Sequence, residues 1–550
     1  MPLERWRPSS PSRRFPTSDP MSARTVRNIL FVMCDQLRWD YLSCAGHPHL
    51  HTPHIDALAA RGVRFDRAFC QSPICGPSRM SFYTGRYMFS HGVGWNNYPL
   101  RVDEWTLGDY LRPLGLKVAL AGKTHMTEDR AGMARLGLDP VSEFGVLVSE
   151  CGFEPFERDD GLHPDRRADP DMPYNRYLRQ KGYSGENPWS GHANSVRDGD
   201  GETLDGWYWG HSNGAADIRE EDSETPYMTD RAIDFITGMG DQPWCLHLSY
   251  IKPHWPYIVP EPYASLYGPE QVLPVHRDAR EGRDPHPVYG AFMRHKDSRL
   301  FRRPEARETI VPAYMGLIKQ IDDHFGRLMA ELERLGRMED TMIVFTSDHG
   351  DYLGDHWLGE KDLFHEASVR IPMIVCDPRA AADATRGTVS QKLVEAIDLV
   401  PTFIEAVGGE VPYHRLEGRS LTPLLHGQEA DWRSFAVSES DYSGRDARAD
   451  LALDPMDARC FMLRTERWKY VLHEKFRPQL FDLEADPGEF SDLGADPDHA
   501  AIRAELHETL FTWFRNRRLR VTISDDEIVA RTGAADRQGI LIGYWRPNDP

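Results

Sequence analysis

The amino-acid sequence predicts an α/β fold: a large, mostly parallel sheet sandwiched by helices, followed by a smaller C-terminal α+β domain with an antiparallel sheet. Short apolar runs alternate with longer amphipathic segments up to about residue 380. Such runs are typical of parallel strands that are buried on both faces. After about residue 430 the pattern changes to short segments separated by Asp, Pro and Gly, which is typical of antiparallel hairpins.

Five apolar runs are predicted to be strands of the main sheet: 28–33 (NILFVM), 117–121 (KVALA), 244–250 (WCLHLSY), 342–347 (MIVFTS) and 371–376 (IPMIVC). Helices are predicted between them, at 52–62, 106–115, 229–240 and 314–336. Strands that alternate with helices in this way form a parallel sheet that is covered on its two faces.

The composition divides the chain into segments. We expect a flexible arm at 1–26, the large α/β domain at 27–430, a C-terminal α+β subdomain at 431–520 and a tail at 521–550. The α/β domain contains a loop-rich insertion at 150–225, which is rich in Asp, Gly, Pro, Trp and Tyr and would lie over a cleft. The tail is a candidate contact in a homo-oligomer, a dimer or a tetramer. Met21 is an alternative start, so residues 1–20 need not belong to the natural protein.

Charge and hydropathy exclude some classes of partner. A net charge of −20 over 550 residues argues against nucleic acid, which requires a basic surface, but allows a small anion in a locally basic cleft. No apolar run reaches the roughly 18 residues of a membrane helix, and the N-terminal arm lacks the apolar core of a signal peptide. We therefore expect a cytoplasmic protein without a membrane partner. The eight cysteines form no CxxC pair.

Polar residues follow four of the predicted strands. They are Asp35 and Gln36, Lys123 and His125, His254, and Asp348 and His349. Each has an ordinary explanation on its own, as a turn residue, a structural histidine or a surface charge. Ligands of open α/β sheets bind beyond the carboxyl ends of the strands, so four such ends together predict one site.

Asp35, Gln36, Asp348 and His349 form an oxygen-rich donor set with one imidazole. Two carboxylates offset the charge of a divalent cation, and Gln and His add neutral donors. We expect one divalent metal ion, with Mn²⁺ or Ca²⁺ favoured and Mg²⁺ or Zn²⁺ left open.

Cys75 is the cysteine with an unusual setting. Pro77 favours the first turn of a helix, so Cys75 is predicted at a helix N-terminus, with Arg79 on the same face one turn later. A thiol with a depressed pKa is one interpretation of this position.

The run 75–86, CGPSRMSFYTGR, is similar to the maturation signature of type I sulfatases, Cys-x-Pro-Ser/Ala-Arg followed by Thr-Gly-Arg. Further motifs occur in the order of that family: FVMCDQLRWD, TPHIDALAARGVRF, GKTH, KPHWPY, FTSDHGDYLGDHWLGEKDLFHEASVRIPMIV and KYVLHEKFRPQLFDLEADPGEFSDL. Over nearly its whole length the chain resembles the formylglycine-dependent sulfatases of the alkaline phosphatase superfamily, close to the group of arylsulfatases and phosphonate monoester hydrolases.

The resemblance implies that a formylglycine-generating maturation system oxidises Cys75 to an aldehyde. One hydroxyl of its hydrate would bind the metal beside the four ligands above and attack the ester, and the second would release the covalent intermediate. It also implies that Arg79 supports the diol and that His125 is the base. Lys361 or His254 would neutralise the leaving oxygen. The expected substrate-binding residues are Asn96, Lys123, His254 and Lys361. Four residues are left outside the catalytic set: Arg86, Asp355, His356 and His365.

The substrate class follows from charge and from two motif positions. Sulfate and phosphonate monoesters are monoanions, whereas a phosphate monoester is a dianion near neutrality and is disfavoured. Gln36 and His349 resemble the ligands of phosphonate monoester hydrolases, but Lys123 and His125 match the sulfatases, since the phosphonate enzymes have uncharged hydroxyl residues there. We expect an arylsulfatase with promiscuous phosphonate monoester and phosphodiester hydrolysis. The alternatives are a phosphonate monoester hydrolase or phosphodiesterase, and a non-catalytic metal- and anion-binding protein.

Overall fold

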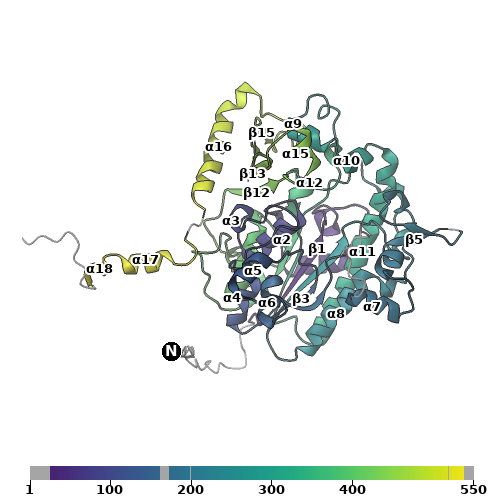
Figure 1. Cartoon of the computed structure of the whole chain (residues 1–550), viewed down its shortest axis with the longest axis horizontal. Helices are drawn as coiled ribbons and strands as arrows, with labels where there is room; N and C mark the ends of the chain where they lie inside the picture. The colour runs from purple at the N-terminus through teal and green to yellow at the C-terminus, as the bar shows by residue number, and fades with distance from the viewer. Residues whose placement is uncertain (1–24, 162–171, 199, 518–519, 538–550) are drawn as a thin grey trace, which may run out of the picture.

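The structure is a computed structural model that describes residues 25–161, 172–198, 200–517 and 520–537. A large sheet runs through the body of the molecule, with helices on its two sides (Figure 1). The smaller C-terminal sheet and its helix α16 (Ala500–Arg515) lie against one end of this body. Among the described residues, no helix combines the length and the apolar character that a membrane crossing needs.

Within the described residues, nine strands form the main sheet. In spatial order they are β11 (Thr388–Glu395), β2 (Val63–Phe69), β10 (Met373–Cys376), β8 (Thr341–Ser347), β1 (Asn28–Asp35), β7 (Trp244–Pro253), β3 (Lys117–Gly122) and β4 (Glu154–Arg158), with β9 (Arg370–Ile371) paired to β2. Strand β1 is parallel to its neighbours β7 and β8. Strand β10 runs antiparallel between β8 and β2. The predicted mostly parallel sheet is therefore confirmed.

Strand β1 shows why the sheet is covered on both faces. Every one of its residues is buried, and successive side chains enter different cores. Ile29, Phe31 and Met33 belong to one core, whereas Leu30 and Val32 belong to the other. Because strand side chains alternate between faces, a strand that is apolar at every position requires a layer of helices on each side.

The two helical layers supply those cores. On the face of Phe31 lie α2 (Cys75–Thr84), α4 (Leu107–Leu111) and α13 (Leu399–Ala406). On the face of Leu30 lie α1 (Pro53–Arg61), α8 (Glu224–Gly238) and α11 (Pro304–Arg334). The predicted helices at 52–62, 106–115, 229–240 and 314–336 all exist, although α8 and α11 begin earlier than predicted because Pro226 and Pro304 lie within their first turns.

The C-terminal subdomain has the predicted antiparallel sheet. Its four strands, in the described part of the chain, are β12 (Phe435–Asp441), β13 (Arg459–Thr465), β14 (Trp468–His473) and β15 (Gln479–Asp482). Helix α16 covers this sheet with Leu506, Leu510 and Trp513. Beyond it, α17 (Asp525–Arg531) extends away from the body (Figure 1). A role of the tail in oligomerisation stays a prediction.

The 150–225 insertion contains more regular structure than its composition indicates. It includes the edge strand β4, the helix α7 (Pro173–Gln180) and a hairpin of β5 (Ser195–Arg197) and β6 (Thr203–Asp205). These elements are short and partly exposed, so they produce little apolar periodicity. The boundaries of the segments stay predictions, and the predicted arm at 1–26 lies almost wholly outside the described residues.

Substitution of Phe31 tests the packing of the core on one face of the main sheet. Its ring stacks on His247 at a centroid distance of 4.4 Å and packs against Phe403 at 5.6 Å. We expect Phe31→Ala to lower the free energy of unfolding by about 3–5 kcal/mol, because the cavity opens in a fully buried layer. Urea denaturation measures the loss. The control Val141→Ala removes a side chain that is 83% exposed and should change little; a Phe31→Ala loss of only about 1 kcal/mol would contradict this packing.

Candidate active site

The predicted site residues come together at the carboxyl ends of four strands. Asp35 ends β1, Lys123 follows β3, His254 follows β7 and Asp348 follows β8. All of these side chains are buried. Parallel strands end at the same edge of a sheet, which is why residues far apart in the sequence meet here.

Cys75 is the first residue of α2, as predicted, and its side chain is buried. The backbone N–H of Gly76 donates to Oδ1 of Asn96 at 2.8 Å, so a residue from a neighbouring loop caps the helix. The hydroxyl of Ser78 donates to the carbonyl of Asp348 at 2.6 Å. These two contacts fix the N-terminus of the helix, and with it residue 75, against the strand ends.

Arg79 holds the strand ends together from within the protein. Its side chain is fully buried. Its Nε donates to Oδ2 of Asp348 at 2.8 Å, and its Nη2 donates to Oδ2 of Asp35 at 3.2 Å. Its Nη1 donates to the carbonyl of Lys123 at 2.8 Å and to the hydroxyl of Ser249 at 2.7 Å. One guanidinium therefore connects residues at the ends of β1, β8 and β3 with a serine inside β7, and its support of a diol at residue 75 stays a prediction.

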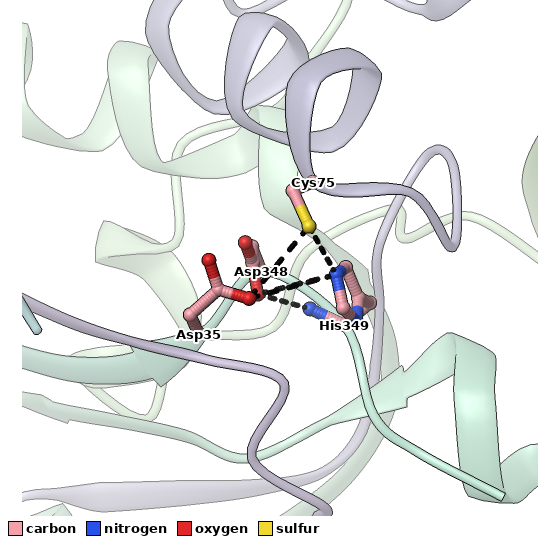
Figure 2. A group of neighbouring side chains, drawn as sticks. All are labelled: Asp35, Cys75, Asp348 and His349. Carbon is pink, nitrogen blue, oxygen red and sulfur yellow. Dashed lines mark hydrogen bonds and ion pairs between the residues drawn. The ribbon is translucent and has the colours of Figure 1, made fainter. Parts of the chain in front are cut away.

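Four of the side chains converge (Figure 2). The ligand atoms of Asp35, Cys75, Asp348 and His349 all lie within 4.8 Å of one another. Arg79 engages Oδ2 of each carboxylate, which leaves the Oδ1 atoms on the side of His349 Nε2, at 3.9 Å for Asp35 and 3.7 Å for Asp348. The other imidazole nitrogen, Nδ1, donates to the carbonyl of Gly350 at 2.9 Å, so Nε2 is the atom that faces Cys75 Sγ at 3.1 Å.

Gln36 joins this set through an oriented amide. Its Nε2 donates to Asp351 at 2.5 Å and to the hydroxyl of Tyr257 at 3.3 Å. Its Oε1 accepts from Lys361 Nζ at 2.7 Å. Two acceptors on the nitrogen side determine which way the amide points, so Oε1 is presented to the site. The backbone of Gln36 has a positive φ of 66°, a strained conformation that is typical of functional positions.

Two lysine ammonium groups and the guanidinium of Arg79 surround residue 75 and the carboxylates. Lys361 Nζ lies 3.3 Å from Cys75 Sγ, and Lys123 Nζ lies 2.5 Å from Oδ2 of Asp35. Burial raises the pKa of the Cys75 thiol, but Lys361 and His349 outweigh it and hold that pKa well below its usual range. The site therefore favours an anionic group at residue 75.

His125 and His254 complete the predicted set. The neighbouring His125 also lowers the pKa of the Cys75 thiol. Its backbone has a positive φ of 54°, which Asp160 holds by accepting its N–H at 3.1 Å. Nδ1 of His125 is buried without a partner among the described residues. Burial lowers the pKa of His254 to about 4, and its Nδ1 donates to the carbonyl of Trp255 at 2.8 Å.

The residues that we left outside the catalytic set have structural contacts. Arg86 pairs with Glu104 at 2.7 Å, and Asp355 pairs with Arg38 at 2.6 Å. His356, His365 and Glu281 form a second buried group of possible metal ligands. The two imidazole rings stack at 3.9 Å, however, and nearly parallel rings do not direct their lone pairs to one point. We interpret this group as a support of the loop.

Several supporting residues were missed from the sequence. Asp351 and Tyr257 orient Gln36, and each lies within a motif that carries the family resemblance, so a signal was present. Ser249 and Asp160 had none, because a serine within a strand and an aspartate in a polar loop are ordinary.

Two family models match the chain. The model described as Sulfatase matches residues 27–409, and the model described as N-sulphoglucosamine sulphohydrolase, C-terminal, matches residues 354–516. The first alone covers more than half of the chain. The chain belongs to the sulfatase family. It is thus an enzyme of the sulfuric ester hydrolase class, in the alkaline phosphatase superfamily. Members of this family generally use a divalent metal ion and a formylglycine residue.

The similar proteins include one named an arylsulfatase and one named a phosphonate monoester hydrolase. The sulfatase is 32% identical to the multifunctional alkaline phosphatase superfamily protein PehA of Trinickia caryophylli, over 89% of this chain and 95% of that protein. It is 26% identical to an arylsulfatase of Clostridium perfringens, over 94% and 98%. Its structure is similar to that of the phosphonate monoester hydrolase SpPMH from Silicibacter pomeroyi, with a TM-score of 0.79, 30% identity and coverage of 91% and 98%.

The role of Arg79 can be measured without an activity assay. Arg79→Met removes the cation shared by Asp35 and Asp348, so two buried carboxylates lose a partner. We expect the metal-free sulfatase to lose about 3–5 kcal/mol of unfolding free energy in chemical denaturation. Arg61→Met, which removes an exposed ion pair with Glu339, is the matched control and should cost less than about 1 kcal/mol. Equal effects of the two substitutions would show that Arg79 does not hold the site together.

Proposed function

We propose that this sulfatase hydrolyses sulfate monoesters as an arylsulfatase, with promiscuous hydrolysis of phosphonate monoesters and phosphodiesters. The observation that supports it most is the position of Cys75. It lies at a helix N-terminus, with its Sγ within 4.8 Å of an oxygen of two carboxylates and a nitrogen of an imidazole, and beside the Lys361 ammonium. A buried site of this kind binds a sulfur or phosphorus ester next to a nucleophile.

The donor set fits a divalent metal ion. Two carboxylate oxygens, the Nε2 of His349 and the Oε1 of Gln36 face a common region, and an anionic group at residue 75 would complete the set. Mn²⁺ or Ca²⁺ suits a mainly oxygen donor set with one nitrogen, and Mg²⁺ or Zn²⁺ remains compatible with it. When bound, the ion would acidify the attacking hydroxyl and polarise the ester.

Residue 75 carries the nucleophile in this proposal. Formylglycine, formed from Cys75 by a maturation system, supplies a geminal diol whose first hydroxyl displaces the leaving oxygen and whose second hydroxyl allows the aldehyde to form again as sulfate departs. The cap from Asn96 fixes the helix that carries this residue. Because Oδ1 of Asn96 accepts from Gly76, its amide nitrogen is the atom that donates to the transferred group.

Lys361 is the residue best placed to neutralise the leaving oxygen. Its ammonium touches residue 75 and is buried, and a cation in a dry site stabilises developing charge strongly. His254 suits this role less well. Its Nδ1 carries the proton that Trp255 accepts, and its pKa of about 4 keeps it neutral near pH 7. His254 Nε2 is therefore an acceptor, suited to a proton of the diol or of a water.

His125 is the proposed base that removes the proton of the second hydroxyl. Its Nδ1 has no partner among the described residues, and a buried polar atom of this kind is usually satisfied by a ligand or a water. Asp160 holds its backbone in place. Lys123 would bind a nonbridging oxygen of the ester while it keeps Asp35 ionised.

The second candidate is a phosphonate monoester hydrolase or phosphodiesterase. The likeness to SpPMH and the ligands Gln36 and His349 favour it. Lys123 and His125 favour sulfate, since a sulfate ester presents three nonbridging oxygens to donors and a phosphonate monoester presents two and a carbon. A non-catalytic binding protein would have no need of an imidazole base beside a nucleophile, so we place it last.

The first test is the mass of the tryptic peptide Ala68–Arg79 after alkylation, from protein made in a host that matures formylglycine. We expect an aldehyde at Cys75 and an alkylated thiol at Cys70, which is the internal control. Cys75→Ala should abolish turnover of aryl sulfates without a change in the thermal midpoint. Alkylation of both cysteines in active protein would overturn the diol mechanism and favour a phosphodiesterase that uses the metal directly.

The second test separates the two ester classes. Replacing Lys123 and His125 together by Thr removes the Lys123 donor to a nonbridging oxygen as well as the proposed base. We expect the ratio of kcat/KM for an aryl sulfate to that for an aryl phenylphosphonate to fall roughly 100- to 1,000-fold, because a lost donor of this type costs about that much. Thr124→Ser, between the two positions, is the control. An unchanged ratio would show that these residues do not select sulfate.

A further inference from the structure

The segment that carries Lys361 is held in a strained backbone conformation. Between residues 353 and 362, five residues other than glycine have a positive φ: Leu353 (46°), His356 (52°), Trp357 (61°), Glu360 (62°) and Asp362 (96°). Side chains with a Cβ rarely adopt this region, because the Cβ crowds the neighbouring carbonyl oxygen. The residues on either side of Lys361 are both strained, so other contacts must hold this turn in place.

The strongest of these contacts comes from the C-terminal subdomain. Arg445, which precedes α15 (Asp446–Asp450), donates Nε to Oδ1 of Asp362 at 2.9 Å and Nη2 to Oδ2 at 2.6 Å. The two parallel hydrogen bonds form the bidentate geometry that is strong and specific in direction. The side chain of Asp362 is only 2% exposed, whereas that of Arg445 is 25% exposed, so the carboxylate end of this pair is shielded from water. Asp362 is also the residue with the largest φ of the five.

A second anchor holds the chain a few residues further along, on the same side of Lys361 as Asp362. Lys469 of β14 donates to the carbonyl of Phe364 at 2.7 Å and pairs with Glu366 at 3.0 Å. The backbone N–H of Glu366 donates to Glu489 at 2.8 Å. Arg445 thus holds the residue directly after Lys361, and Lys469 of the C-terminal sheet holds Phe364 and Glu366 beyond it.

The position of Lys361 depends on this support. Its ammonium lies 2.7 Å from Gln36 Oε1 and 3.3 Å from Cys75 Sγ, and its backbone has no regular secondary structure. A long flexible side chain on an unsupported turn would sample many positions. To hold the ammonium in one position, the backbone turn that carries Lys361 must itself be fixed by its neighbours.

We propose that Arg445 is a positioning residue, which acts through Asp362 to place the Lys361 ammonium at the leaving oxygen. The C-terminal subdomain would then complete the active site without contacting the substrate. This inference rests on the proposed function, because Lys361 has its assigned role only in ester hydrolysis. Arg445 also lies 4.9 Å from the ring of Trp95, which is next to Asn96, so Asp362 must be varied separately.

The experiment compares leaving groups. We expect Arg445→Met and Asp362→Asn each to lower kcat roughly 10- to 100-fold for aryl esters of weakly acidic phenols. Esters of nitrophenols, whose leaving oxygen needs little help, should lose much less, and KM should stay nearly constant. Arg445→Lys keeps the charge without the bidentate contact and should fall in between. Arg294→Ala, which removes an exposed ion pair between Arg294 and Asp450 of α15, is the matched control and should have no effect.

A double-mutant cycle decides whether Arg445 acts through Lys361. If it does, Arg445→Met added to Lys361→Ala causes no further loss. A loss that is equal for all leaving groups, or additive with Lys361→Ala, would overturn the proposal. The series is measured with aryl sulfates and with aryl phenylphosphonates, so the parent enzyme reports separately on the proposed function.

A crystal structure of the Asp362→Asn variant gives a readout without turnover. We expect Lys361 Nζ to leave Gln36 Oε1, whereas retention of the 2.7 Å contact would contradict the positioning role. This distance decides the proposal even if the parent hydrolyses neither class of ester.

Discussion

The active site depends on one buried guanidinium. Arg79 has no exposed surface, and it bonds to two carboxylates, a backbone carbonyl and a hydroxyl that lie in or directly after four different strands. An arginine suits this place because its planar fork offers several donors in fixed directions and never loses its charge. By engaging Oδ2 of Asp35 and Asp348, it turns the other oxygen of each carboxylate toward residue 75. The same contact therefore neutralises the acidic ligands and orients them.

The other side chains of the site are also held by hydrogen-bond partners, each of which orients one reacting group. Asp351 and Tyr257 orient the amide of Gln36, Gly350 determines the tautomer of His349, and Asp160 holds the backbone of His125. The partners come from the insertion, from the loops and from the C-terminal part of the chain. Local strain at Gln36, His125 and Asp362 is tolerated because these partners over-determine the conformation. A precise site is thus a property of the whole fold, although its reacting atoms occupy a small volume.

This division between reacting groups and their partners explains what the sequence could predict. The five apolar strands, the helices between them and the polar residues at the strand ends follow from local patterns, and the motif around Cys75 indicates the family. Strands β2, β4 and β11 were not predicted, because their half-exposed sequences alternate with charges. Asp160 and Arg445 were not predicted either. Their contacts join segments far apart in the chain, and no spacing in the sequence records that Arg445 reaches Asp362.

The charge inside the active site differs in sign from the net charge of the whole chain. The chain carries a net charge of −20, which would repel an anionic ester at long range. Charges on the surface, however, are screened within about 10 Å at 0.1 M salt. Arg79, Lys123 and Lys361 are buried within the site, where fields are stronger and less screened. With a divalent ion bound they would outweigh the two carboxylates, so the site would attract an anion although the surface would not.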